Sequence, residues 1–233
     1  MSEAPKPKQY IQLASINFDG SPEIKQHIVS IIDSIFDPLP KDLDAETTTQ
    51  LLLTILEGFD PDTVKHSNDL ANLVEPFAKE FSQSNEDIYK ASEASLNSLR
   101  WATLLHDIGK IGILPIVNKE ILTDREKNFR KFHATLTYYI LEKFPCFRES
   151  VSRIAASNHV RITGNGYPNW LGWETIPFEA KILMVADAYH SMIRPRNGGS
   201  ARLNHGPALQ VMSGMGFDTR VMKTFRKIIQ HRL

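Results

Sequence analysis

The stretch Leu104-Leu105-His106-Asp107-Ile108-Gly109-Lys110-Ile111-Gly112 carries the strongest signal in this chain. Its imidazole and carboxylate stand side by side at the predicted end of a helix, which the Ile-Gly step interrupts. Two such neighbours can bind one cation, and the carboxylate can also bridge two cations, as in two-metal hydrolases. The lysine follows three residues after Asp107 and can neutralise a phosphate oxygen. The pair alone is also compatible with a capped helix end that carries a solvent-exposed histidine, so its meaning depends on the rest of the sequence.

Other candidate metal ligands are spread along the chain. The sequence contains eight histidines, several of them next to aspartate, asparagine or glycine. Imidazole and carboxylate groups are ligands that borderline transition metals accept. The candidates outside the quoted stretch are His66, His133, the Asn158-His159 pair and Asp187. A fold that brings these distant segments together would form a metal centre.

Apolar residues recur at helical spacing through most of the chain, and alternating strand-like stretches are missing. Ser21-Pro22-Glu23 is a typical helix start, because a capping serine is followed by proline and an acid. An irregular glycine-rich loop is expected at Gly164–Gly172. The pattern predicts helices over 21–37, 45–58, 60–81, 85–107, 124–144, 147–159, 177–193, 206–212 and 218–231. We therefore expect an all-α fold, organised as a single compact helical bundle.

Length and composition indicate the domain organisation. The 233 residues suit one large domain, and a hydrophobic content of 42% allows a sizeable core. Residues 1–20 show no clear period and contain prolines and a glycine. We expect a flexible or lightly docked arm over 1–20, a helical lead-in over 21–48 and the functional domain over 49–233.

Several classes of protein are disfavoured by the composition. No apolar run approaches the ~18 residues of a membrane span, and no secretory signal is visible at the start. The single Cys146 cannot form an internal disulfide, so the cytoplasm is the expected compartment. A net charge of zero argues against binding of duplex nucleic acid. Residues 188–233 carry eight lysines and arginines against one acid, which indicates either a local anionic ligand or a solvated helix face.

In their order along the chain, these residues resemble the HD-GYP family. This family is the branch of bacterial HD-domain metal-dependent phosphohydrolases that degrades the messenger cyclic di-GMP. The likeness runs from about Leu51 to Ile229, most of the chain. It is carried by Leu51–His66, by the HD-x-G-K-x-G signature at 106–112, by Gly166-Tyr167-Pro168 and by Gly216-Phe217-Asp218. The resemblance implies an HD-type helical bundle with an irregular Gly-Tyr-Pro loop.

The resemblance also implies the roles of individual residues. The family binds two, sometimes three, divalent transition metals, usually iron or manganese; the ligand types also allow zinc or nickel. By position, one metal would be held by His66, His106, Asp107 and Asp187, and Asp107 would bridge to a second metal at His133 and His159. Lys110 corresponds to the lysine that touches the scissile phosphate. Asp107 and Lys110 are therefore the expected catalytic residues, acting with a metal-activated water.

The segment that begins at Asn158 departs from the family pattern H-H-E-x-x-D-G-x-G-Y-P. Asn158 replaces one imidazole, and Val160 and Thr163 replace the two acids. An amide oxygen is a poor ligand for a borderline transition metal compared with histidine. The second metal should therefore bind more weakly or take a water in place of the lost nitrogen, and Asn158 is a candidate for an additional ligand.

A second departure follows Asp187, where the family usually has another aspartate three residues on and then an arginine-proline-tyrosine stretch. Here His190 stands at that position, followed by Arg194-Pro195-Arg196. Either Arg194 or Arg196 is expected to contact the phosphate of the substrate. His190 lies one helical turn from Asp187, so it is either an additional ligand or a histidine that packs against a loop or solvent.

Two further positions remain open. Asp62 lies four residues before His66 on the same helix face, where some family members hold a third metal; it also suits a helix start, where an acid complements the dipole. In the family, the loop that corresponds to Gly164–Pro168 lines the substrate site and contacts signalling partners. Tyr167 is therefore a predicted substrate-binding residue, and this loop is a predicted partner site.

Three functions are compatible with these features. The first is a metal-dependent phosphodiesterase that opens cyclic di-GMP to linear pGpG and, with a second cleavage, to GMP. The second is a catalytically weakened HD-GYP-like module that binds metal and nucleotide or docks a signalling partner. The third is the same chemistry on another phosphate ester, because a fold does not fix its substrate. The acidic N-terminal helices would pack on the bundle or form a homodimer face.

The departure at Asn158 leads to a direct test. If the amide is what weakens the second metal, Asn158→His should raise both the occupancy of that metal and the hydrolytic activity. Metal analysis and a turnover assay of the purified variant measure the two effects. No change in either would place Asn158 outside the cluster.

Overall fold

The computed structural model describes residues 21–117, 119, 121–194 and 203–232. The expected arm over 1–20 and the candidate Arg196 lie outside the described residues. Within the described part the chain is all-α without strands, which confirms the predicted fold class. No described helix has both the length and the hydropathy that a membrane-spanning segment needs.

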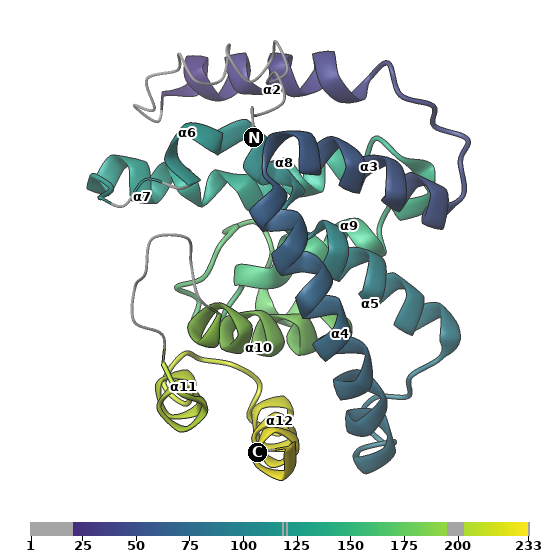
Figure 1. Cartoon of the computed structure of the whole chain (residues 1–233), viewed down its shortest axis with the longest axis vertical. Coiled ribbons are helices and arrows are strands. Elements are labelled where there is room, and N and C mark those ends of the chain that lie inside the picture. The colour runs from purple at the N-terminus through teal and green to yellow at the C-terminus, as the bar shows by residue number, and fades with distance from the viewer. Residues whose placement is uncertain (1–20, 118, 120, 195–202, 233) are drawn as a thin grey trace, which may run out of the picture.

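The α-helices and short 3-10 helices (η) follow one another along the chain (Figure 1). They are α2 Pro22–Phe36, α3 Ala45–Phe59, α4 Pro61–Ser84, α5 Glu93–Leu105, η1 Ile108–Ile113, α6 Leu114–Val117, α7 Asp124–Arg130, α8 Phe132–Leu141, η2 Pro145–Phe147, α9 Val151–Ala156, η3 Ser157–His159, η4 Trp173–Thr175, α10 Phe178–Ile193, α11 His205–Met212 and α12 Thr219–Arg232. The helix α2 lies across one end of the bundle, and α11 and α12 lie at the other (Figure 1).

Two predicted helix starts are wrong, each for a local reason. The helix expected from Asn85 begins at Glu93, because Ser92 and Ser95 form a reciprocal capping box there. The helix expected from Phe147 begins at Val151, because Glu149 adopts a positive φ of 61° that an α-helix cannot contain.

The helix expected over 124–144 is also wrong, because it is divided at Lys131. The backbone amide of Ala134 bonds to the oxygen of Lys131 at 3.3 Å, a spacing of three residues. The carbonyl oxygen of Arg130 is thereby available to the ring of His133, whose Nδ1 lies 2.6 Å away. The break therefore serves to hold a candidate metal ligand.

One hydrophobic core joins the helices. It includes Ile28 of α2, Leu56 of α3, Phe77 of α4, Ile140 of α8 and Phe225 of α12, all at most 1% exposed. The lead-in thus shares its core with the rest of the chain, and the boundary predicted at residue 48 stays a prediction.

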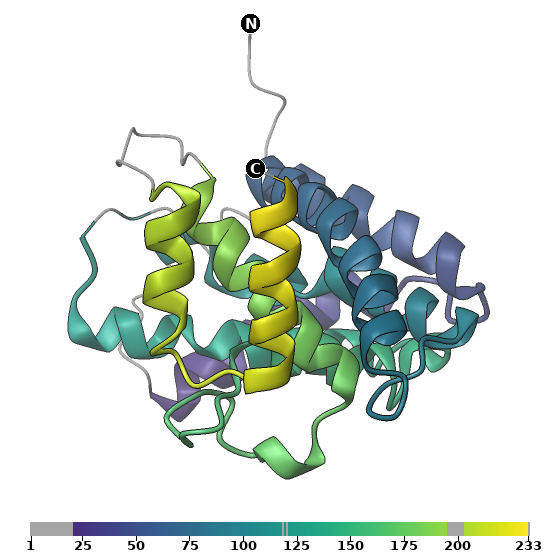
Figure 2. The same cartoon turned by 90° about the horizontal axis from the view of Figure 1, so that it is seen from below.

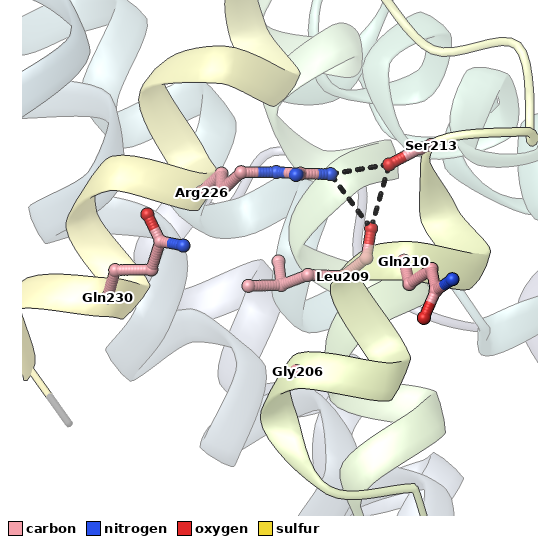
Figure 3. A pocket seen from close by; sticks show the side chains of 6 residues that line it. All are labelled: Gly206, Leu209, Gln210, Ser213, Arg226 and Gln230. Atoms are coloured by element: carbon pink, nitrogen blue, oxygen red, sulfur yellow. Dashed lines mark hydrogen bonds between the residues drawn. The ribbon is translucent and has the colours of Figure 1, made fainter.

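At the C-terminal end, α11 and α12 run side by side (Figure 2) and enclose a hollow of about 330 Å³. Arg226 donates to the carbonyl oxygen of Leu209 at 3.2 Å and to the Ser213 hydroxyl (Figure 3). The hollow is lined by Gly206, Leu209, Gln210, Ser213, Arg226 and Gln230. At least this cation of the basic C-terminal segment has a structural role at the end of α11, so its charge is no evidence for an anionic ligand.

Gly109 lies where the turn after α5 meets α8. Its amide donates to the Thr137 hydroxyl at 3.1 Å, and that hydroxyl donates to the carbonyl oxygen of His106 at 3.1 Å. A Cβ at residue 109 would overlap the carbonyl oxygen of His133 and lie 2.5 Å from the Thr137 amide. Only glycine permits this approach, which fixes the distance between the His106-Asp107 pair and the histidine of α8.

Gly109→Ala is therefore expected to destabilise the protein by more than about 3 kcal/mol, because two backbone segments must separate. The melting temperature should fall by roughly 6–12 °C for a chain of this size. Gly58→Ala is the matched control, since nothing lies within 4 Å of a Cβ there. Thermal unfolding followed by circular dichroism measures both variants, and similar melting temperatures would contradict the close approach.

Candidate metal centre

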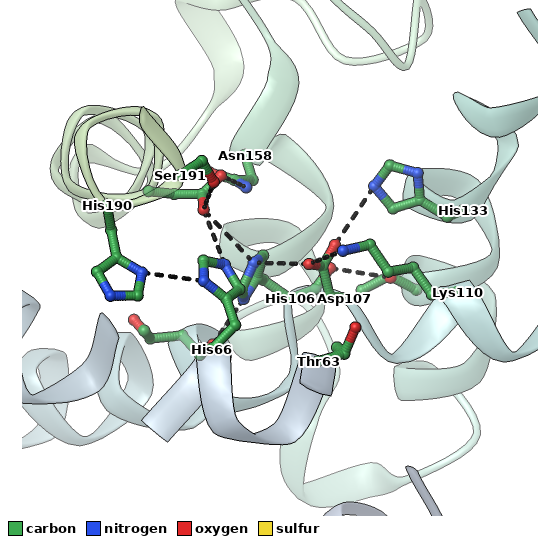
Figure 4. A network of polar contacts seen from close by, with 12 residues as sticks. Thr63, His66, His106, Asp107, Lys110, His133, Asn158, His190 and Ser191 are labelled. Atoms are coloured by element: carbon green, nitrogen blue, oxygen red, sulfur yellow. Dashed lines mark hydrogen bonds and ion pairs between the residues drawn. The ribbon is translucent and has the colours of Figure 1, made fainter. Parts of the chain in front are cut away.

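Four helical segments meet around a buried polar cluster (Figure 4). The cluster receives His66 from α4, the His106-Asp107 pair from the end of α5, His133 from α8 and Asp187 from α10. Each of these side chains belongs to a residue that is at most 8% exposed. Buried imidazole and carboxylate groups are costly unless they are paired or coordinate a metal.

The first group consists of His66, His106 and Asp107, whose ligand atoms all lie within 4.8 Å of one another. His106 Nε2 is 3.2 Å from Asp107 Oδ2. Asp187 borders this group, with its Oδ1 3.0 Å from His66 Nε2 and 3.9 Å from His106 Nε2. The structure therefore brings together the four residues that were expected to hold one metal, and their role as ligands stays a prediction.

The second group consists of Asp107, His133 and His159, again with ligand atoms within 4.8 Å of one another. His133 Nε2 lies 3.5 Å from Asp107 Oδ1 and 3.1 Å from His159 Nε2. Asp107 belongs to both groups, and its two oxygens face different histidines. This is the arrangement that a bridging carboxylate requires.

The hydrogen bonds orient the rings toward the centre. Nδ1 of His106 lies 2.7 Å from the carbonyl oxygen of Thr103, and Nδ1 of His133 lies 2.6 Å from that of Arg130. A carbonyl oxygen only accepts, so both Nδ1 atoms carry a proton, and Nε2 is the nitrogen of each ring that can bind a metal once any proton on it is displaced. This tautomer is the one that a metal ligand needs.

Two buried atoms in the cluster are poorly satisfied by the described residues: Asn158 Oδ1 has no hydrogen-bond partner, and His106 Nε2 faces only the Asp107 and Asp187 carboxylates as ion pairs, at 3.2 and 3.9 Å. Buried polar atoms without a protein partner are rare in folded chains, and a bound ion can satisfy them. Together with the mixed nitrogen and oxygen donors, they show that these residues fit a divalent metal ion.

Protonation states agree with metal binding. Burial would raise the pKa of Asp107, but the charges of His106 and Lys110 hold it well below its usual value. Burial lowers the pKa of His159 to about 3, and the neighbouring His133 adds to this effect. Burial opposes protonation of His106, yet the Asp107 carboxylate raises its pKa to about 9. The carboxylate is therefore charged, and a cation at the centre would replace the proton on His106.

The remaining site predictions lie around this centre. Lys110 Nζ is 2.5 Å from Asp107 Oδ2 and its side chain is 24% exposed, so it lies at the open side of the cluster. The Tyr167 ring stacks on His159 with centroids 4.5 Å apart. Arg194 donates instead to the backbone oxygen of Asp62 at 3.0 Å. Neither Asp62 nor Arg194 belongs to the two ligand groups.

The side chain of Asn158 is directed toward Asp187. Its Nδ2 donates to Asp187 Oδ2 at 2.8 Å, while Oδ1 has no partner in the described part of the chain. His190 contacts His66, with the two Nδ1 atoms 3.0 Å apart. Burial lowers the pKa of His190 to about 4. Whether Asn158 or His190 is an additional ligand stays a prediction.

Two residues that contact the candidate ligands were not identified from the sequence. The Ser191 hydroxyl donates to Asp187 Oδ1 at 3.2 Å, and the Thr137 hydroxyl bonds to the His106 carbonyl. Both stand four residues after a predicted ligand on the same helix, a spacing that places side chains on one face. That spacing was the available signal.

Comparison with known proteins now assigns the fold. The family model described as "HD domain" matches residues 55–221, most of the chain. The chain belongs to the HD-domain family. The predicted resemblance to its HD-GYP branch is confirmed by the relatives together with this match.

The relatives of this HD domain include phosphodiesterases. A protein of Thermotoga maritima named cyclic di-GMP phosphodiesterase is 28% identical over 184 residues, which cover 77% of this chain and 48% of that protein. A 3'3'-cGAMP-specific phosphodiesterase 3 of Vibrio cholerae is 30% identical over 61% of this chain and 29% of that protein. The chain thus spans about half or less of the length of these curated relatives.

A solved structure supports the same fold. The HDG"Y"P protein from Bdellovibrio bacteriovorus superimposes with a TM-score of 0.56 at 13% identity, over 95% of this chain and 70% of that one. At this identity the likeness concerns the fold alone, and it agrees with the predicted HD-type bundle.

The two ligand groups of the HD domain make a testable distinction. His133 belongs only to the second group, so His133→Ala should lower the metal content at saturating Mn²⁺ by about one ion per chain. Asp107→Ala should lower the metal content further, because it removes a ligand from both groups. His27→Ala, on the exposed face of α2, is the matched control. Metal analysis of the purified variants measures the number of ions per chain. Equal metal content in His133→Ala and the unmodified protein would contradict metal binding by the second group.

Proposed function

We propose that the chain is a metal-dependent phosphodiesterase that hydrolyses cyclic di-GMP to linear pGpG. The observation that carries the proposal is the sharing of Asp107 by two histidine groups, with the Lys110 ammonium against the carboxylate oxygen that also faces His106. The names of the relatives from Thermotoga maritima and Vibrio cholerae point to cyclic dinucleotides as the substrate class.

Divalent cations at such a centre supply Lewis-acid stabilisation of the phosphate charge and activate a water for attack. The residues of the chain provide the geometry for that chemistry. Asp107 would hold both cations, since its oxygens are directed to His106 and His133 on opposite sides. Lys110 would bind a non-bridging phosphate oxygen, because its ammonium lies at the centre and remains partly exposed. Attack of water at phosphorus then breaks one P–O bond of the ring and yields the linear dinucleotide.

We further propose that two ions bind, with iron or manganese favoured and zinc or nickel compatible with the same ligands. The second ion should bind more weakly than the first. Its group has two imidazoles and the shared Asp107, and the Asn158 side chain is directed to Asp187 and does not complete this group. A second cleavage to GMP would use the same groups.

Contacts with other proteins belong to the proposal as well. The Gly164–Pro168 loop is flanked by Ile162 and Trp170, which are 53% and 50% exposed. Large apolar side chains that face solvent near a loop suit a partner surface, so we propose that a signalling protein docks here. A homodimer and a cytoplasmic location remain predictions from the sequence.

Turnover of cyclic di-GMP in the presence of Mn²⁺ or Fe²⁺ tests the proposed activity. We expect linear pGpG as the first product. Parallel assays test 3'3'-cGAMP and a nucleotide monophosphate as alternative substrates. Binding of cyclic di-GMP without any product would contradict the proposal and identify a binding module instead. Hydrolysis of the monophosphate alone would contradict the substrate class.

Lys110→Met should lower kcat by ~10²–10³, because a positioned positive charge at the reacting phosphate is lost. Lys127→Met is the matched control, since Lys127 pairs with Asp124 on the surface of α7. Steady-state kinetics with cyclic di-GMP compare the two variants. Equal kcat values would show that Lys110 does not act on the phosphate.

A further inference from the structure

The histidines of the two ligand groups differ in how their Nδ1 atoms are satisfied. Nδ1 of His106 and of His133 donates to a backbone carbonyl oxygen three residues earlier in the chain. These bonds come from the local helix geometry and need no other side chain. His66 lies instead within the regular helix α4, where the backbone carbonyls are engaged in the helix itself. Its Nδ1 therefore requires a hydrogen-bond partner from elsewhere.

That partner lies on α10. His190 Nδ1 lies 3.0 Å from His66 Nδ1, with ring centroids 5.0 Å apart and ring planes inclined by 23° (Figure 4). On the opposite side of the ring, His66 Nε2 lies 3.0 Å from Asp187 Oδ1; without a metal this nitrogen donates to the carboxylate, and a cation bound there would take the place of that proton. His66 thus has one nitrogen toward the centre and one toward His190.

Two nitrogen atoms in contact need one proton between them. A neutral imidazole has one donor and one acceptor nitrogen, so either His66 or His190 donates through Nδ1. If His190 donated, His66 would carry its proton on Nε2, which would then face the centre and could not bind a cation. If His66 donates, its Nε2 lone pair is available for a metal. Metal binding and the hydrogen bond are therefore linked through the position of one proton.

We propose that His190 is a positioning residue that accepts the Nδ1 proton of His66 and so keeps Nε2 of His66 available to the metal. This inference rests on the proposed metal-dependent function and assigns to His190 a role different from that of an additional ligand. The carbonyl oxygens of Thr103 and Arg130 play the same part for the rings of His106 and His133. Such partners of ligand histidines typically contribute a factor of ~10–100 to metal affinity.

The stereochemistry of the side chain provides a conservative replacement. Oδ1 of asparagine is attached to Cγ, as Nδ1 of histidine is, so it can occupy the same position relative to the backbone. It accepts a hydrogen bond but carries no charge and no ring. His190→Asn should therefore keep the hydrogen bond, while His190→Ala removes it.

The test measures the metal affinity of the full chain, independently of turnover. The metal-free protein is titrated with Mn²⁺ and the tightest binding event is compared among His190→Ala, His190→Asn and the control His27→Ala. We expect a Kd raised ~10–100-fold in the alanine variant and a return to within a few-fold of the unmodified protein in the asparagine variant. The control should be unchanged.

A second measurement reports on the proton itself. In the Zn²⁺-loaded, ¹⁵N-labelled protein, we expect a slowly exchanging Nδ1–H signal of the His66 ring that His190→Ala abolishes or exposes to rapid exchange. This readout would not respond to a merely structural role of His190 in packing α4 against α10. The His66→Asn variant identifies the signal by its absence.

Each outcome decides the inference. An unchanged Kd in His190→Ala would overturn it, as would a zinc-loaded His66 ring that carries its proton on Nε2, or the absence of any Mn²⁺ binding in the unmodified protein. Failure of His190→Asn to restore affinity, in a variant with unchanged circular dichroism, would also overturn it. If the affinities follow the expectation but cyclic di-GMP is not hydrolysed, the proposed substrate fails and the role of His190 stands.

Discussion

The structure depends on one buried carboxylate, that of Asp107, which faces two groups of imidazoles at once. A carboxylate that is 4% exposed is unfavourable unless positive charge surrounds it. Lys110 supplies one such charge, and His106 supplies another when it is protonated. Metal cations between Asp107 and the histidines would satisfy the same requirement. The helices that meet here therefore have to place positive charge beside a buried carboxylate, in addition to packing their apolar faces.

The fold supports this carboxylate through breaks in otherwise regular helices. The end of α5 at Leu105 and the division between α7 and α8 at Lys131 each place the acceptor for a candidate ligand histidine three residues before it. Gly109 then allows the turn to approach α8 so closely that the candidate ligands His106 and His133 both lie beside Asp107. The breaks in the helical pattern therefore orient the rings of His106 and His133.

The sequence predicted most of this arrangement where the signal was local. The helical spacing of apolar residues predicted the all-α fold, and the resemblance carried by the His106-Asp107 signature implied that the candidate ligands lie together. Helix starts were less predictable, because the Ser92–Ser95 box and the positive φ of Glu149 depend on backbone geometry. The contact between His66 and His190 joins residues far apart in the chain, so no spacing rule reveals it. The direction of Asn158 toward Asp187 likewise follows from packing.

The central claim is that Asp107 bridges two cations of unequal affinity. Anomalous scattering from crystals grown with saturating Mn²⁺ tests it most directly, since the peaks report both the number and the place of the ions. The account predicts two peaks about 3.5–4 Å apart on either side of Asp107, with lower occupancy beside His133 and His159. A single peak away from Asp107, or no peak within coordinating distance of its oxygens, would contradict it.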